Sequence, residues 1–169
     1  MKLFLFKSFT LRISTIMRFR SLTCILLLTV IIFALTNSGY AESENSLLQQ
    51  RKILQLKKIL EKNPDDAEAH SSLGKAYEEL GNYKYAIKAY KEVIRLRSGD
   101  AEAHNSIGSA YTWVGDYDKA IDHYKEALKI NPDYVEAHYN LGSAYDTLGK
   151  YEETINEYKE VIRLSPDNA

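Results

Sequence analysis

The chain has 169 residues, with 22 lysines and arginines against 23 aspartates and glutamates, so its formal net charge is close to zero. The charge is unevenly distributed: residues 1–41 hold five basic residues and no acid, whereas residues 42–169 hold 17 basic and 23 acidic residues. An acidic body argues against a nucleic-acid binder, which needs a basic face to neutralise phosphates. Cys24 is the single cysteine, so residues 42–169 can form no disulfide, cysteine nucleophile or thiolate metal site.

The front of the chain has the order of residues found in a secretory signal peptide. Basic residues up to Arg20 precede an almost unbroken apolar run from Leu22 to Leu35, and small and polar residues lead to Ala41. A helix over that run spans about 21 Å, less than the roughly 30 Å of a membrane's hydrocarbon core. We therefore expect export to a periplasmic or secreted location, with cleavage after Ala41. The alternative is a retained membrane anchor with the body outside the cytoplasm, and a start at Met17 would make the signal more compact.

The rest of the chain contains three copies of a 34-residue unit. The copies cover residues 67–100, 101–134 and 135–168. Residues 42–66 read as a linker followed by a capping helix that resembles the second half of a degenerate copy. A period of this length predicts a solenoid, in which each unit buries its apolar face by stacking on its neighbours.

Within each copy, apolar residues recur at helical spacing in two separate stretches. In the first copy these stretches run over residues 73–80 and 86–96. A glycine separates them in every copy, at Gly81, Gly115 and Gly149, and glycine suits the left-handed residue that follows a helix end. Each copy is therefore expected to be a pair of antiparallel helices, which makes the fold class all-α.

A second set of glycines, Gly74, Gly108 and Gly142, lies inside the first helix of each copy. An interior glycine costs a helix about 0.5–1 kcal/mol relative to alanine. Its recurrence at one aligned site predicts a close contact between helices there, which a larger residue at Gly108 would disrupt.

The links between copies are expected to end one helix and start the next. Proline at Pro64 and Pro132 cannot continue a helix. Asp65 or Asp66, Asp100 and Asp133 are candidate N-caps, because a carboxylate can accept a hydrogen bond from a free backbone N–H of the first helical turn.

The three copies resemble the tetratricopeptide repeat family, whose pattern has a fixed set of small and aromatic positions. The second copy shows it as Ile107-Gly108, Tyr111, Gly115-Asp116-Tyr117, Ala120, Tyr124, Ala127 and Pro132. Departures are modest; Thr154 and Ser98, for example, replace an alanine and a proline. The resemblance implies three full TPR-type repeats after an N-terminal half repeat, in a right-handed superhelix whose first helices line a concave groove for peptide segments of partner proteins.

By the same resemblance, the side chains facing the groove come from the first helix of each copy. The expected partner-binding residues are Lys75, Glu78, Glu79, Glu102, Asn105, Ser109, Trp113, Tyr139, Asn140, Ser143 and Asp146. Trp113 is a candidate hot spot, and the alternative is that it folds over the next repeat. Carboxylates outnumber the lysine in the groove, which favours basic or polar ligands; the alternative is that acids at helix starts only complement the helix dipole.

The histidines do not predict a metal site. His70, His104 and His138 occupy one aligned site, and neighbouring helices pack about 8–10 Å apart, whereas zinc ligands lie about 2 Å from the ion. Packing within each repeat is their expected role, and His123 is expected at the surface. The chain also shows no phosphate loop, HExxH motif or serine elbow, so we expect no enzyme activity, no catalytic residue, no metal and no cofactor.

The second helix of the third copy is expected to expose apolar side chains, because no polar helix follows it. Ile155, Tyr158, Val161 and Ile162 form this edge, which predicts self-association or a bound partner.

These features together predict an exported, non-enzymatic adaptor whose partners are other proteins. The alternatives are a membrane-tethered factor for assembly or oligomerisation, and an accessory subunit that positions a partner enzyme. Nucleic acid is not an expected partner, and contact with a membrane is expected only through residues 1–41 if that segment is not cleaved.

Overall fold

The computed structural model describes residues 44–166. The predicted signal segment, its cleavage site and its alternative role as an anchor lie outside the described residues. Within residues 44–166 the regular structure is α-helical and no strand occurs. None of the helices in this part of the chain is long and apolar enough to cross a membrane.

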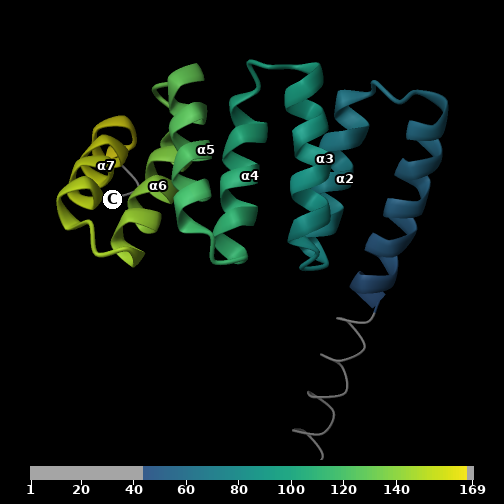
Figure 1. The fold of residues 1–169 in the computed structure, drawn as a ribbon, viewed down its shortest axis with the longest axis horizontal. Helices are drawn as coiled ribbons and strands as arrows, with labels where there is room; N and C mark the ends of the chain where they lie inside the picture. Colours follow the sequence, from purple (N-terminus) through teal and green to yellow (C-terminus); the bar gives the residue numbers. More distant parts are fainter. Residues whose placement is uncertain (1–43, 167–169) are drawn as a thin grey trace, which may run out of the picture. The chain divides into compact units, whose positions relative to one another are not determined.

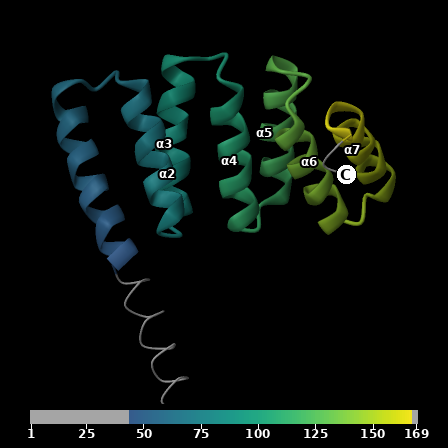
Figure 2. The same ribbon diagram turned by 180° about the vertical axis from the view of Figure 1, so that it is seen from behind.

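The helices follow one another as hairpins. After an N-terminal helix over residues 44–62, three pairs occur: α2 (Ala67–Glu79) with α3 (Tyr83–Leu96), α4 (Ala101–Trp113) with α5 (Tyr117–Ile130), and α6 (Val135–Thr147) with α7 (Tyr151–Leu164). Consecutive helices lie side by side and run in opposite directions (Figures 1 and 2), and α4 also contacts α6. The predicted all-α class and helical-hairpin solenoid are confirmed.

The turn within each pair is built on a glycine in the left-handed region. The φ angles of Gly81, Gly115 and Gly149 are 68°, 79° and 71°, where a residue with a Cβ atom is strained. In the first turn, the N–H of Gly81 donates to the carbonyl of Glu78 at 2.8 Å. The N–H of Asn82 donates to the carbonyl of Tyr77, also at 2.8 Å. This pair of bonds closes the helix end and sends the chain back antiparallel.

Two of the three predicted N-caps are present. The Oδ1 atoms of Asp66 and Asp100 accept hydrogen bonds from the third backbone N–H of α2 and α4, both at 2.9 Å. The prediction for Asp133 is wrong, because α6 begins one residue later, after Tyr134, which makes no side-chain cap bond. Asp133 instead accepts a hydrogen bond from Nη2 of Arg163 at 3.4 Å.

Each interior glycine lies against a tyrosine ring from the second helix of its own pair. A Cβ atom at the glycine would come within 2.5, 2.6 and 2.7 Å of that ring for the pairs Gly74–Tyr90, Gly108–Tyr124 and Gly142–Tyr158. The ring therefore passes directly over the backbone of the first helix. Its hydroxyl reaches the residue one turn after the glycine, where Tyr90 contacts Glu78 and Tyr124 contacts Thr112.

The apolar core of the described residues falls into three clusters, each shared between helix pairs. They consist of Ile53 with Leu73, Ala76 and Ala89; of Ala86, Ile87 and Tyr90 with Ile107 and Ala110; and of Ala120, Ile121 and Tyr124 with Leu141, Ala144 and Tyr145. Each cluster joins the second helix of one unit to the first helix of the next. Because burial is shared in this way, the stability of each pair depends on its neighbours.

Candidate partner-binding groove

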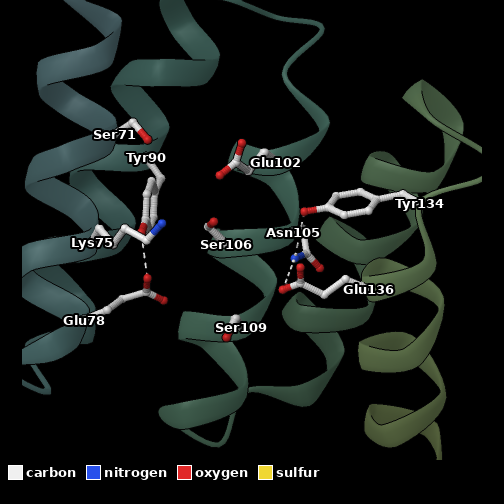
Figure 3. A pocket seen from close by; sticks show the side chains of 10 residues that line it. All are labelled: Ser71, Lys75, Glu78, Tyr90, Glu102, Asn105, Ser106, Ser109, Tyr134 and Glu136. Atoms are coloured by element: carbon white, nitrogen blue, oxygen red, sulfur yellow. Dashed lines mark hydrogen bonds between the residues drawn. The ribbon is translucent and has the colours of Figure 1, made fainter. Parts of the chain in front are cut away.

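A pocket of about 210 Å³ lies between α2, α4 and the start of α6 (Figure 3). Five of the predicted groove residues line it: Lys75, Glu78, Glu102, Asn105 and Ser109. The remaining wall is also mainly polar and comes from Ser71, Ser106, Glu136, Tyr90 and Tyr134.

Helical spacing brings these side chains to one surface. Lys75 and Glu78 are three residues apart on α2, and Glu102, Asn105 and Ser109 follow at spacings of three and four on α4. Residues at such spacings share one face of a helix. The first helices of successive repeats thus present one polar face each to the same pocket, as the resemblance to tetratricopeptide repeats implies.

Glu78 and Tyr90 form a partly buried, hydrogen-bonded pair in the pocket. The hydroxyl of Tyr90 donates to Oε2 of Glu78 at 2.6 Å. Burial raises the pKa of Glu78 above its ordinary value, and the hydrogen bond from Tyr90 and the charge of Lys75 oppose this rise. Burial and the contact with Glu78 also raise the pKa of Tyr90. The pocket thus holds a partly buried carboxylate whose negative charge is not fully compensated.

Asn105 ties two repeats together behind the pocket. Only 3% of its surface is exposed. Its Nδ2 donates to Oε1 of Glu136 at 3.1 Å and contacts the hydroxyl of Tyr134 at 3.4 Å, while its Oδ1 accepts from Nδ2 of Asn140 at 3.1 Å. The amide is fully engaged, so Asn105 holds Glu136 and Tyr134 at the pocket wall and leaves no free donor for a ligand.

The other predicted groove residues lie outside this pocket. Glu79, Ser143 and Asp146 are exposed. Trp113 is 68% exposed, and its ring stacks parallel to that of Tyr83 from the preceding repeat, with 5.5 Å between centroids. Tyr139 is 56% exposed, with its ring centroid 5.8 Å from that of Tyr158.

Two aromatic residues of the pocket, Tyr90 and Tyr134, are not among those predicted from the sequence. The hydroxyl of Tyr90 reaches the pocket because Gly74 leaves room for the ring to cross α2. Tyr134 stands at the aligned site where Asp66 and Asp100 cap their helices. That break in the pattern was the signal for a different role.

His138 packs within its repeat, as expected: its Nδ1 lies 2.7 Å from Oε2 of Glu157. Nε2 of His70 and Nε2 of His138 lie 2.9 Å from the carbonyl oxygens of Pro64 and Pro132, which precede their repeats, and since a carbonyl can only accept, Nε2 donates in both. The prediction that His123 lies at the surface is wrong. It is half-buried, and it contacts His104 from the same repeat.

The described residues place no group of three or more histidine, cysteine, aspartate or glutamate side chains where they could hold a metal ion.

The predicted apolar edge on α7 is partly exposed. Ile155 and Ile162 are 55% and 53% exposed, while Tyr158 and Val161 are half-buried.

Comparison with known proteins identifies the repeats. The family described as "Tetratricopeptide repeat" matches residues 67–100 and 135–168, and the one described as "TPR repeat" matches residues 114–149. No curated protein matches the chain.

Solved structures of MamA resemble the fold. One crystal structure of MamA is 33% identical, with a TM-score of 0.65 over 68% of this chain and 67% of the MamA chain. A second is 29% identical, with a TM-score of 0.65 over 76% and 75% of the two chains. MamA from Desulfovibrio magneticus RS-1, from residue 41 to its end, is 22% identical with a TM-score of 0.67 over 70% and 67%, which shows the fold alone.

The repeats and the MamA-like neighbours together support a protein–protein interaction scaffold, on a fold typical of non-enzymatic adaptors. The core clusters shared between helix pairs and the left-handed turn glycines agree with a tetratricopeptide repeat fold. The chain belongs to the tetratricopeptide repeat family.

Proposed function

We propose that the protein is a non-enzymatic adaptor that binds basic segments of partner proteins in the pocket between α2, α4 and α6. The observation that carries the proposal is the charge of this pocket. Glu78, Glu102 and Glu136 line it, and Lys75 is the single basic residue beside them. An arginine or lysine side chain entering the pocket would supply the missing positive charge.

The state of the three carboxylates supports a cationic ligand. Glu78 is partly buried, so a cation beside it would offset a desolvation penalty that the free protein already carries. Glu136 is held in place by Asn105 through the 3.1 Å bond from Nδ2. Glu102 is exposed at the rim, where a charge chiefly raises the rate of encounter with an oppositely charged ligand.

Fluorescence anisotropy with two labelled probe peptides tests the proposal. The peptides share one sequence except that three positions are arginine in one and glutamate in the other. The arginine peptide should bind the full chain and the glutamate peptide should not, and binding should weaken as salt screens the charges. Equal affinity for both peptides, or no binding of the arginine peptide, would sink the proposal.

A matched pair of charge reversals locates the binding. Glu102→Lys changes a carboxylate in the pocket, whereas Glu79→Lys changes an exposed carboxylate outside it. We expect Glu102→Lys to weaken binding of the arginine peptide about tenfold, which is the scale of one close charge pair. Glu79→Lys should have little effect on this affinity. An equal loss in both variants would point to the net charge of the protein and not to this pocket.

We also propose that the adaptor acts outside the cytoplasm. The support is the sequence order of residues 1–41, basic then apolar then small and polar. A mature N-terminus near Glu42 in exported protein tests cleavage. Detergent-dependent extraction of the intact chain would instead favour the membrane-tethered alternative.

The exposed face of α7 favours self-association as a second part of the proposal. Ile155 and Ile162 stand one heptad apart on that face, and a second copy of the chain is the occupant that we propose. Sedimentation of the full chain should show a concentration-dependent dimer or larger species that Ile155→Ser weakens. A monomer at all concentrations would contradict it.

A further inference from the structure

Two histidines meet in the second repeat, away from the pocket. His104 lies on α4 and His123 on α5, and their Nδ1 atoms are 3.3 Å apart. The ring centroids are 5.5 Å apart, and the ring of Tyr111 stacks on His123 at 5.7 Å. Both side chains are half-buried on helices whose neighbouring residues Ala103 and Tyr124 are in the core. The two imidazoles are therefore held by packed helices and not by loops.

The same two sites differ in the other repeats. In the first repeat His70 is matched with Ala89, and in the third His138 is matched with Glu157, whose Oε2 lies 2.7 Å from Nδ1 of His138. The third repeat therefore joins an imidazole to a carboxylate. The second repeat alone among these three puts two ring nitrogens face to face.

We propose that His104 and His123 bind a divalent transition-metal ion, with zinc as the best match, through their Nδ1 atoms. Two nitrogens bound to a tetrahedral zinc ion at about 2.0–2.1 Å each lie about 3.3 Å apart. The separation in the free protein is 3.3 Å. Neutral imidazole is also a ligand type that zinc and its neighbours in the first transition row prefer.

Without metal, one Nδ1–H donates to the other Nδ1, since two bare lone pairs or two protons would repel. For the ion to bind, the proton on that Nδ1 must move to Nε2 of the same ring by exchange with solvent, so both rings stay neutral, no net proton is released, and both Nδ1 atoms donate lone pairs. The exchange needs no oxidant or reductant. It replaces one long hydrogen bond with two coordinate bonds in the same place.

The two histidines are the protein ligands in this proposal. Among the described residues no third histidine, cysteine, aspartate or glutamate is placed to join them. Water would complete a four-coordinate site.

Cobalt(II) and zinc(II) titrations of the full chain, carrying a purification tag without histidine, test the proposal. We expect one Co²⁺ per chain with the visible absorption of a tetrahedral complex, its displacement by Zn²⁺, and a higher unfolding temperature with either ion. An absence of both the absorption and the thermal shift would overturn the proposal.

Variants assign the ligands. His104→Gln and His123→Gln should each weaken Zn²⁺ binding at least tenfold, and the control His70→Gln, at the matched site beside Ala89, should not. Binding that survives in His104→Gln would refute the pair as the site.

Discussion

Gly108 and Tyr124 are in contact so close that no side chain fits between them: a Cβ at Gly108 would lie 2.6 Å from Cε1 of the Tyr124 ring. The ring belongs to a core cluster that joins α5 to α6. A methyl group at Gly108 must therefore displace a buried ring, and Tyr124 is 2% exposed.

We predict that Gly108→Ala lowers the free energy of unfolding by about 1–3 kcal/mol, the range for overpacking a core, although alanine is the better helix former. Urea denaturation measures the change. Gly99→Ala is the matched control, because a Cβ at Gly99 meets nothing within 4 Å and its φ is not positive. Equal stability of the two variants would contradict the close contact.

Glu78 predicts a pH dependence of stability. Burial raises its folded-state pKa above the ordinary value, so the unfolded chain loses this proton at lower pH than the folded protein does. Stability from this group is complete below the ordinary pKa, falls as pH rises from there through the raised value, and stays low at neutral pH. Glu78→Gln removes the ionisation and keeps an oxygen acceptor for Tyr90.

Glu78→Gln should therefore be more stable than the parent protein near pH 7 and equal to it below about pH 4, where a carboxylate of ordinary pKa is mostly protonated. Thermal unfolding across this range measures the difference. Glu79→Gln, one residue away but exposed, serves as control and should track the parent protein. A difference at pH 7 in the opposite direction would show that the carboxylate stabilises the fold.

We predict that truncating Asn105 lowers the free energy of unfolding by more than the small size of its side chain would suggest. Asn105→Ala leaves Asn140 and Glu136 without their partner between α4 and α6. We expect a destabilisation of about 1–3 kcal/mol, the cost of stranded polar groups, in urea unfolding. Ser143→Ala, at an exposed site on α6, should change stability by less than about 0.5 kcal/mol. The same small effect at Asn105 would show that the network contributes nothing.

The two aspartates before α4 and α6 should behave differently. Asp100 caps α4 through the 2.9 Å bond from the N–H of Ala103, so Asp100→Ala should cost about 1 kcal/mol. Asp133 makes an exposed pair with Arg163 at 3.4 Å, so Asp133→Ala should cost under about 0.5 kcal/mol. Chemical denaturation of both variants decides, and a larger loss at Asp133 would reverse the assignment.

The fold could be predicted because its determinants repeat. The 34-residue period, the glycines that separate paired helices and the helical spacing of apolar residues each occur three times, so no single ambiguous residue decides the architecture. Asp133 shows the limit of this reasoning. It follows a proline as Asp65 does, yet the cap position is the next residue, which only the helix boundary reveals.

The candidate site was only half predictable, because it depends on contacts between aligned sites that differ. The hydroxyl of Tyr90 reaches Glu78 through the space at Gly74. A comparison of the aligned copies identifies these three residues but does not show that they are in contact. The contact between His104 and His123 was not predicted for the same reason. Comparing the histidines at one position of the repeat could not reveal that a histidine at a different position is their partner.

The tyrosines that cross the interior glycines have a consequence for how the proposed binding pocket can be altered. Tyr90 belongs to α3, the second helix of its pair, but its hydroxyl donates to Glu78 on α2, the first helix. Tyr90→Phe would thus remove one hydroxyl group from the pocket wall while every residue of α2 and α4 stays unaltered. The polar groups of the pocket can therefore change independently of the helices that form it, because the second helix of a pair supplies part of the chemistry at the face of the first.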